Sequence, residues 1–372
     1  MRRALLALVL IGAAVCAQAL PAPAQTAPAA APDSGFEMRE LDSRAIPIGG
    51  ALADNAQWQA WKARFLTDQG RVVDTANGNM SHSEGQGYGM LLAVAANDRV
   101  AFERIWAWTR ANLAVRADDL FAWRWEPDKR PAVGDVNNAT DGDMLIAWAL
   151  TEASDFWGEP SYRVAARGLA IAISRKTFFL KPPWGVVMLP AIDAFADADR
   201  PDGPVVNPSY WVFPAFERLR LAAPDVNWRG LAQTGLDIVK AAHFGEKRLP
   251  PDWLSLRDKT PTIADGFPPN FGYNAIRIPL YLVRGGAVGG PLLEPFRQMA
   301  AAEGVPLVDV STDAVVERLT DPGYRLVGAI VACTAGTPIP DELRVFRPTN
   351  YYPSTLQLLG LAWLAEREPP CR

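Results

Sequence analysis

A glutamate at the start of a glycine-rich helix is the first group in this sequence that could do chemistry. Glu84 lies within the stretch Ser-His-Ser-Glu-Gly-Gln-Gly-Tyr-Gly-Met, residues 81–90, and an apolar run typical of a helix follows. Gly85, Gly87 and Gly89 fall within the first turns, and each costs roughly 1 kcal/mol relative to alanine inside a helix. A sequence selected only for folding would not keep three such glycines. The sequence therefore predicts that something large approaches this backbone and that Glu84 faces it.

A second acidic motif opens another predicted helix. The stretch Asn-Ala-Thr-Asp-Gly-Asp places Asp141 and Asp143 in the first turn of a segment whose apolar residues keep helical spacing as far as Trp157. A helix dipole stabilises negative charge in this turn, and that is reason enough for Asp143. Two helix N-termini that each present an acid, one of them beside glycines, are typical of the carboxylate pair of a glycosidase.

Small polar residues beside these acids are the predicted N-caps. A hydroxyl or amide oxygen there accepts a hydrogen bond from a backbone N–H that has no partner in the first turn. Ser81 or Ser83 is the predicted cap of the first helix. Asn138 or Thr140 is the predicted cap of the second.

The elements that must position these acids are mostly helices. Apolar spacing predicts roughly a dozen of them, mostly joined antiparallel, with few strand signals. Residues 121–127 are expected to form a loop or a short strand, and residues 184–208 and 245–270 form long loops rich in proline and aspartate. Long loops that carry aromatic and acidic residues favour a double-layered toroid with a binding face. A repeat of 20–50 residues is absent, which argues against a solenoid.

Aromatic residues beside the loops suggest the kind of ligand. The chain has 13 tryptophans, and most are expected in the core. Those that lie in or beside loops are Trp123, Trp125, Trp184 and Trp211. Indole rings pack against the C–H faces of sugars, so these residues are candidates to line a carbohydrate groove.

Composition excludes several classes of function. The chain has 372 residues, 49% of them hydrophobic, which is enough for a sizeable core. Its net charge is −4, and it becomes −6 once Arg2 and Arg3 are removed with a leader that contains no acid, so nucleic acid is not an expected partner. The histidines are His82 and His243, which form neither a metal spacing nor a catalytic triad, so no metal and no cofactor are expected.

The N-terminal segment is predicted to be removed or unstructured. Residues 1–19 combine two arginines, a short apolar run and Ala-Gln-Ala, which is the pattern of a secretory signal peptide. The apolar run is too short for a comfortable membrane span. Residues 20–34 are predicted to be an Ala/Pro-rich linker, and the protein is expected in the periplasm or outside the cell. Cys333 and Cys371 remain and could pair in such an oxidising compartment.

Four ordered motifs resemble glycoside hydrolase family 8. Residues 139–157 look like the family signature, although Thr151 stands where the family prefers an aliphatic residue or glycine. Residues 83–90 resemble its general-acid motif, and residues 207–211 and 273–277 are further matches. The resemblance covers about residues 35–366.

This resemblance implies an all-α fold, a single (α/α)6 barrel domain over residues 35–372 that hydrolyses β-1,4-glucan with inversion. It also suggests the endoglucanases that accompany bacterial cellulose synthesis, with the cellulose-synthesis apparatus as a partner. By position, Glu84 matches the general acid, and Asp141 matches the aspartate that holds the sugar ring at the cleavage point. The residues expected to bind substrate are Trp123, Tyr210, Tyr273, Asn274 and Arg277.

Asn274 departs from the pattern, since many members carry an aspartate there as the general base. Asparagine cannot take a proton from water, so either another carboxylate replaces it or activity is low. The candidates are Asp141 itself or Asp252, Asp258 and Asp265 in the preceding loop. A non-catalytic glucan-binding protein is therefore one alternative, and a hydrolase of chitosan, xylan or mixed-linkage glucan is another.

Overall fold

The structure is a computed structural model that describes residues 47–52, 56–287 and 290–366. All of these residues lie in the compact unit formed by residues 38–372. The predicted leader, the predicted linker and Cys371 lie outside the described residues, whereas Cys333 is described and is disulfide-bonded. None of the helices in the described ranges is long and apolar enough to cross a membrane.

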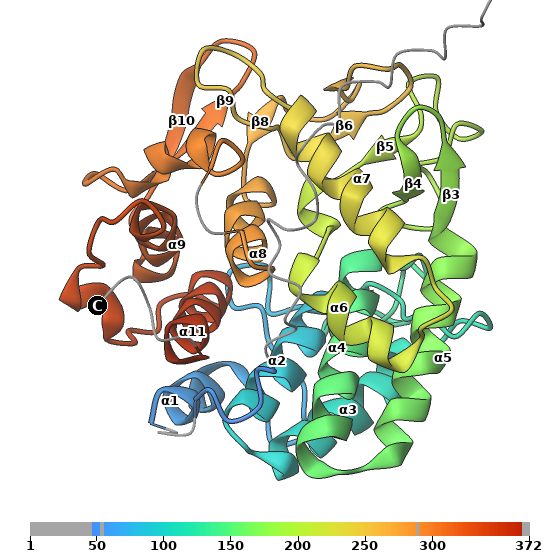
Figure 1. Ribbon diagram of the computed structural model, residues 1–372. Helices are drawn as coiled ribbons and strands as arrows, with labels where there is room; N and C mark the ends of the chain where they lie inside the picture. Colours follow the sequence, from blue (N-terminus) through green and yellow to red (C-terminus); the bar gives the residue numbers. More distant parts are fainter. Residues whose placement is uncertain (1–46, 53–55, 288–289, 367–372) are drawn as a thin grey trace, which may run out of the picture. The chain divides into compact units, whose positions relative to one another are not determined.

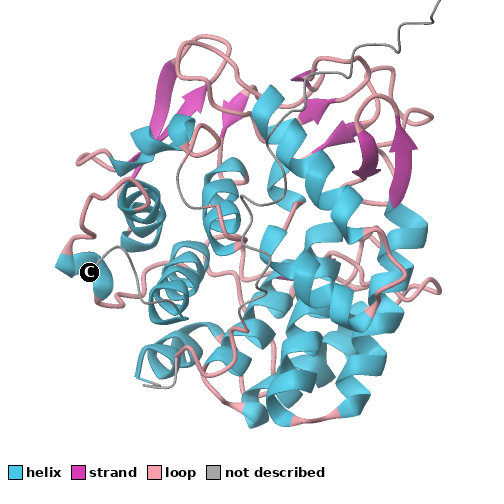
Figure 2. Cartoon of the chain, in the orientation of Figure 1, coloured by secondary structure: helices cyan, strands magenta, loops and turns pink. Residues whose placement is uncertain are grey.

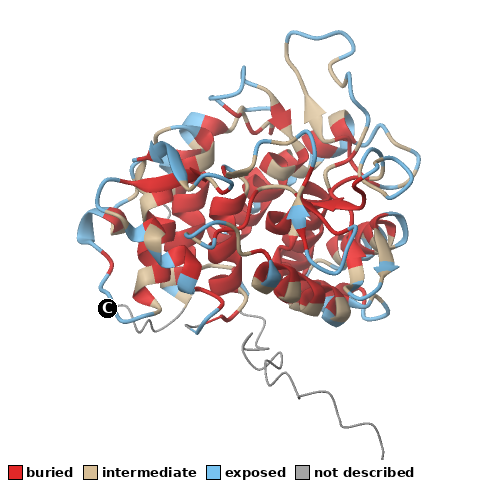
Figure 3. Cartoon of the chain, turned by 90° about the horizontal axis from the view of Figure 1, so that it is seen from above, coloured by how far each residue is buried: buried red, intermediate tan, exposed pale blue. Residues whose placement is uncertain are grey.

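Six helices are buried over most of their length, and they form the centre of the molecule (Figure 3). They are α2 (Ser83–Ala95), α4 (Thr140–Trp157), α6 (Phe213–Ala222), α8 (Ile278–Arg284), α9 (Pro322–Cys333) and α11 (Tyr351–Glu366). Each contacts the next in this order, and α11 returns to contact α2. Helices that are apolar on nearly all sides need neighbours on all sides, and this closed succession supplies them.

Six further helical elements lie against the central ones (Figure 1). They are α1 (Ala56–Phe65), α3 (Arg99–Leu113), α5 (Pro160–Thr177), α7 (Trp228–Ala241), the 3-10 helix η4 (Glu294–Ala300) and α10 (Asp341–Arg344). These elements bury one face only: α3 buries Phe102 and Ile105 and exposes Arg99 and Glu103. The prediction of a predominantly helical protein is confirmed.

Most of the short strands were missed by the sequence patterns, although β2 lies in residues 121–127, which were predicted to form a loop or a short strand. They are β1 (Ser81–His82), β2 (Arg124–Trp125), β3 (Phe178–Lys181), β4 (Gly185–Met188), β5 (Val205–Val206), β6 (Leu254–Ser255), β7 (Thr262–Ile263), β8 (Asn270–Phe271), β9 (Val305–Asp309) and β10 (Ala314–Leu319). They pair antiparallel in the orders β1-β2, β3-β4, β5-β6-β7 and β10-β9-β8. Strands β3 to β10 gather at one end of the molecule, at the top of Figure 2. Runs of two to six residues are too short for an alternating pattern to show, so the loops were predicted without them.

The glycines of α2 make room for other parts of the chain, so the large neighbour predicted to approach this backbone is chiefly helix α4. A Cβ atom at Gly87 would lie 2.6 Å from the Cβ of Leu145 and 3.0 Å from the backbone nitrogen of Ile146, both in α4. A Cβ atom at Gly89 would lie 2.7 Å from a methyl group of Val72. These glycines bring α2 close to its neighbours, and the acids at the starts of α2 and α4 come close together as a result.

The caps of both acidic helices also differ from the prediction. His82 is the N-cap of α2, and its Nδ1 accepts from the backbone N–H of Gly85 at 2.9 Å. Ser83 is already helical, and its buried hydroxyl has no hydrogen-bond partner among the described residues. Ala139 is the N-cap of α4 and has no polar side-chain atom to cap the helix, and the hydroxyl of Thr140 donates to the backbone carbonyl of Leu189. Tertiary contacts thus decide which polar group reaches a helix end.

Candidate active site

One pocket of about 700 Å³ brings the predicted site residues together. Its lining includes Glu84, Trp123, Asp141, Tyr210, Tyr273, Asn274 and Arg277. These residues come from the starts of α2 and α4, from the loop around β2, and from the 3-10 helices η2 (Pro208–Tyr210) and η3 (Ala275–Arg277) with the residues before η3. Their roles stay predictions, but their positions allow them to act on one ligand.

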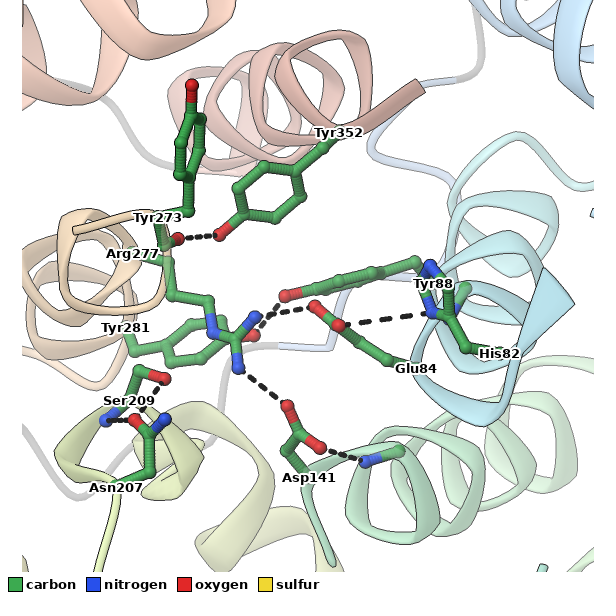
Figure 4. A network of polar contacts seen from close by, with 12 residues as sticks. His82, Glu84, Tyr88, Asp141, Asn207, Ser209, Tyr273, Arg277, Tyr281 and Tyr352 are labelled. Carbon is green, nitrogen blue, oxygen red and sulfur yellow. Dashed lines mark hydrogen bonds and ion pairs between the residues drawn. The ribbon is translucent and has the colours of Figure 1, made fainter. Parts of the chain in front are cut away.

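Arg277 joins the two acids of the site (Figure 4). Its Nη1 donates to Oε1 of Glu84 at 2.6 Å, and its Nη2 donates to Oδ2 of Asp141 at 2.6 Å. The side chains of Arg277 and Asp141 are 3% and 2% exposed, whereas that of Glu84 is 19% exposed. Charge-assisted bonds of this kind fix geometry, so the guanidinium sets the spacing of the carboxyl groups. Glu84 is the more accessible of the two acids.

The buried position of Asp141 changes its protonation. Burial, with a contribution from the nearby charge of Glu84, raises the pKa of Asp141 to about 7, and Arg277 opposes the rise. Its Oδ1 also accepts from the backbone N–H of Gly142 at 2.8 Å. Like charges that share one cation cannot both ionise freely, so the site can hold a proton near neutral pH.

Tyrosines surround Arg277, and sequence reasoning missed most of them. The hydroxyl groups of Tyr88 and Tyr281 hydrogen-bond to each other, and the Tyr352 hydroxyl donates to the carbonyl of Tyr273 at 2.9 Å (Figure 4). Burial raises the pKa of Tyr88, Tyr281 and Tyr352, so all three stay neutral at ordinary pH. The sequence did carry a signal, since Tyr88 lies in the glycine-rich motif and Tyr352 follows another tyrosine at a helix start.

Trp123 is the one of the four loop tryptophans that lines this pocket. Its Nε1 donates to Asp135 at 2.7 Å, and the Arg124 guanidinium lies 4.5 Å from its ring centroid. Trp125 lies instead in a shallow hollow beside α3, and the Trp184 indole donates to the carbonyl of Asp258. Trp211 is 1% exposed, and its indole donates to a backbone carbonyl of α7, so it belongs to the core.

Asp143 holds the loop that carries Trp123. Its side chain is fully buried and accepts from the backbone N–H of Phe121 at 3.0 Å and from Nδ2 of Asn138 at 3.0 Å. Burial raises the pKa of Asp143 to about 7. A dipole-compensating aspartate was predicted here, and the structure gives it a second task as a loop anchor.

Of the three loop aspartates considered as a base, Asp252 is the one linked to the pocket: it is not a lining residue itself, but it interacts with Asn274, which is. Its Oδ1 accepts from the backbone N–H groups of Gly272 at 3.1 Å and Ala275 at 2.7 Å, and it interacts with the side chain of Asn274. Burial raises the pKa of Asp252 to about 6, and these hydrogen bonds oppose the rise. Asp258 and Asp265 are exposed and do not line the pocket.

The described residues offer no ready set of ligands for a metal ion. No group of three or more histidine, cysteine, aspartate or glutamate side chains there could hold a metal ion. The geometry of the site is that of an acid pair held by a cation, with a sugar-sized pocket lined by aromatic rings.

Comparison with known proteins shows the family of the chain. A family model described as "Glycosyl hydrolases family 8" matches residues 47–366. The chain is 37% identical over 322 residues to a probable endoglucanase of Novacetimonas hansenii, which covers 83% of this chain and 92% of that protein. It is 42% identical over 230 residues to an endoglucanase of Cellulomonas uda, with 60% and 62% of the two chains covered.

Solved structures give the same result. The structure of endo-β-1,4-glucanase CMCax from Acetobacter xylinum matches with a TM-score of 0.75 at 36% identity, covering 87% of this chain and 99% of that one. An endoglucanase of Klebsiella pneumoniae matches with a TM-score of 0.74 at 35% identity, covering 83% and 98%. The fold and the site thus define a glycoside hydrolase. The chain belongs to glycoside hydrolase family 8.

Proposed function

We propose that this glycoside hydrolase is an inverting endo-β-1,4-glucanase that acts on cellulose-type β-glucan. The observation that carries the proposal is the single guanidinium of Arg277, bonded at 2.6 Å to both Glu84 and Asp141 in one aromatic-lined pocket. The relatives described as endoglucanases, at 37% and 42% identity, support the substrate class. Trp123, Tyr210 and Tyr273 line the pocket and offer ring faces to glucose units.

The proposed architecture is the (α/α)6 barrel. Six buried helices follow one another in a closed succession, and each is preceded in the chain by an outer helical element. Helix α11 contacts both α1 and α2, which joins the last hairpin to the first. The first residues of α2 and α4, Ser83 and Thr140, then lie at the same end, and this places their acids in one pocket.

Inverting hydrolysis needs one protonated carboxyl and one ionised carboxylate on opposite faces of the sugar. In this mechanism Glu84 gives its proton to the glycosidic oxygen as the bond from that oxygen to the anomeric carbon breaks. A water molecule forms the new bond to the same carbon from the other face, and its proton passes to the base. The two carboxyl groups of such enzymes stand roughly 6.5–9.5 Å apart, which leaves room for this water.

Asp252 is the base in this proposal. Asn274 lines the pocket and its side chain interacts with Asp252, so a water held at Asn274 has a carboxylate close by. A pKa of about 6 leaves Asp252 ionised at neutral pH and still basic enough to accept a proton. Asp258 and Asp265 are exposed and do not line the pocket, so the buried Asp252, which interacts with the lining residue Asn274, suits this role better.

The proposal also includes a location in the periplasm or outside the cell. The leader-like residues 1–19 support export to the periplasm or the exterior. Association with a cellulose-synthesis apparatus is proposed only on the resemblance to endoglucanases of that kind.

Glu84→Gln tests the function. We expect kcat for reducing-end release from carboxymethylcellulose to fall by about 10²–10⁴-fold, because the leaving oxygen loses its proton donor. Glucan binding, measured by calorimetry with a cellooligosaccharide, should stay close to that of the parent. Retained turnover would remove Glu84 from the acid role.

Asn274 favours one second candidate, a glucan-binding protein with little catalysis. A parent chain that binds cellooligosaccharides but releases no reducing ends would support that reading. Parallel assays on chitosan, xylan and mixed-linkage glucan would show whether hydrolysis is directed at another polymer.

A further inference from the structure

A row of three titratable side chains runs along one wall of the pocket. Asp74, His82 and Glu84 all line it, with side chains that are 6%, 15% and 19% exposed. Nε2 of His82 lies 3.4 Å from Oδ2 of Asp74, and Nδ1 of His82 lies 3.9 Å from Oε2 of Glu84 (Figure 4 shows the His82–Glu84 contact). The mechanism above uses Glu84 but leaves Asp74 and His82 without a task.

The cap of α2 fixes the tautomer of His82. Nδ1 accepts from the Gly85 N–H at 2.9 Å, and a nitrogen that accepts in this way carries no proton. The proton of the neutral ring therefore lies on Nε2 and faces Asp74. Asp74 is itself held in place, because Oδ1 accepts from Ala76 N–H at 3.1 Å and Oδ2 accepts from Asn77 at 2.7 Å.

The space around His82 allows the ring little freedom. The Tyr351 ring of α11 packs edge-on against it, with the ring centroids 5.6 Å apart. A Cβ atom at Gly85 would lie 3.2 Å from Cε1 of His82 and 3.2 Å from the Tyr351 hydroxyl. Glycine at position 85 thus allows the imidazole to reach the helix end.

Glu84 depends on His82 in two ways. It is the second residue of α2, so the cap that orders the first turn also sets where its side chain begins. Arg277 already occupies Oε1, so the proton that a general acid donates must lie on Oε2, which is the oxygen that faces His82. A neutral imidazole tolerates that proton, whereas an imidazolium would favour the ionised carboxylate and would also lose the Gly85 bond.

We propose that Asp74 and His82 form a positioning pair that holds the first turn of α2 and keeps Glu84 in the geometry of a proton donor. This rests on the proposed role of Glu84 as the general acid. Neither residue contacts the reacting atoms in this proposal, since both act through Glu84.

The charged groups around His82 make the pair sensitive to pH. Asp74 from the preceding loop, Glu84 from α2 and Asp141 from α4 face the ring, and Tyr351 covers it from α11. Burial lowers the pKa of His82, but the hydrogen bond to Asp74 and the charges of the three acids outweigh it, so the pKa is raised. As pH falls, His82 gains a proton on Nδ1, the cap breaks, and activity should fall with it.

The test compares two substrates whose leaving groups differ in their need for acid catalysis. One is a cellooligosaccharide, whose leaving sugar needs a proton, and the other is the 2,4-dinitrophenyl glycoside of a cellooligosaccharide, whose leaving group does not. For His82→Ala we expect kcat on the first to fall by roughly 10–100-fold with KM within about threefold, and kcat on the second to fall by less than about threefold. His82→Asn, which keeps a capping oxygen, should recover part of the loss.

Asp74→Asn examines the other member of the pair. The amide oxygen can still accept from Nε2, but the negative charge that favours the imidazolium is gone. We expect the acid limb of the kcat–pH profile on the cellooligosaccharide to move to lower pH. An unmoved limb would contradict the link between Asp74 and the protonation of His82.

Asn227→Ala is the matched control. Asn227 caps α7 in the same manner, with its side chain accepting from Gly230 N–H at 3.0 Å, and it is not a lining residue of the pocket. Loss of this cap should lower stability without changing the ratio of the kcat values on the two substrates. Equal losses on both substrates for His82→Ala would show a merely structural role and overturn the proposal.

Glu84→Gln on the same two substrates separates the two proposals. If its loss is confined to the cellooligosaccharide while His82→Ala affects both substrates alike, the positioning pair is wrong and the acid stands. If Glu84→Gln itself affects both substrates alike, the assignment of the acid fails, and the positioning pair fails with it.

Discussion

At the scale of single residues, the site depends on three charged side chains that lie close together in a small space. Arg277 is 3% exposed and contacts Glu84 and Asp141 through the two arms of one planar group. A lysine could not make both contacts with the same fixed geometry, because its charge sits on one atom. The arrangement keeps two acids close together, and in the proposed mechanism the base is a third carboxyl, Asp252, beside Asn274.

Asparagine substitutions in the loop before Asn274 test the choice of base. Asp252→Asn should lower kcat by about 10²–10⁴-fold, because the attacking water loses its proton acceptor. Asp258→Asn and Asp265→Asn make the same change at exposed positions and should keep parental activity. Reducing-end assays on the three variants, with circular dichroism to check folding, provide the measurement.

The pH profile adds a second check on Asp252. Its pKa of about 6 predicts that kcat/KM rises as pH increases through 6, since the base works only when ionised. Full activity in Asp252→Asn would transfer the role to Asp141, the remaining candidate.

At the scale of elements, the site exists because α2 and α4 pack closely. Gly87 of α2 lies against the backbone of α4 near Ile146, with no room for a methyl group. Each acid stands in the first turn of its helix, where the helix dipole favours negative charge. The distance between the helices therefore helps to set the distance between the acids.

Gly87→Ala should weaken this packing. The new Cβ would lie 2.6 Å from a side-chain atom and 3.0 Å from a backbone atom of α4, so the helices must separate. We expect a loss of about 1–3 kcal/mol in the free energy of unfolding, measured by urea denaturation. Activity should fall as well, because Glu84 and Asp141 move apart.

Gly168→Ala is the matched control for this packing. Gly168 lies in α5, and a Cβ there meets nothing within 4 Å. This variant should be more stable by roughly 0.5–1 kcal/mol, since alanine is the better helix former. Stabilisation by both alanines would show that α2 and α4 are not in close contact.

At the scale of the whole molecule, the closed succession of helices buries carboxyl groups whose ionised form is more stable in water. Burial raises the pKa of Asp141 and Asp143 to about 7 and that of Asp252 to about 6. A carboxyl whose pKa is raised in the folded state keeps a proton that the unfolded chain has already released. Such a group lowers stability as pH rises from the unfolded value, near 4, to the folded one.

Asp143→Asn isolates this effect, because Asp143 lies apart from the proposed acid and base. Between pH 5 and pH 8 the parent should lose stability relative to the variant by on the order of 2 kcal/mol. The constant cost of an altered hydrogen bond cancels when the difference is compared across pH. Urea unfolding at several pH values gives the measurement, and a constant difference would contradict the raised pKa.

The exposed neighbour Asp119 supplies the comparison. Asp119→Asn makes the same chemical change on the surface, at a left-handed backbone position with φ of 65° that asparagine tolerates well. Urea unfolding of this variant over the same pH series is the control for the amide substitution itself.

Several features could be predicted from the sequence because they are local. The 3.6-residue spacing of apolar side chains gave most of the helices, and the acids in first turns gave Glu84 and Asp141 as site candidates. The strands could not be predicted in this way, because pairs such as β5 and β6 are two residues long and depend on partners distant in the chain.

The tertiary structure alone decided how the local features combine. It showed that the glycines of α2 serve α4, that His82 rather than a serine caps α2, and that Asp252 is the loop aspartate beside Asn274. It also brought Arg277 between two acids that lie 57 residues apart in the chain. The sequence by itself determines which groups stand at helix ends, because capping and periodicity act over one or two turns. Which groups then meet depends on the closure of the helices around one centre, which no local pattern encodes.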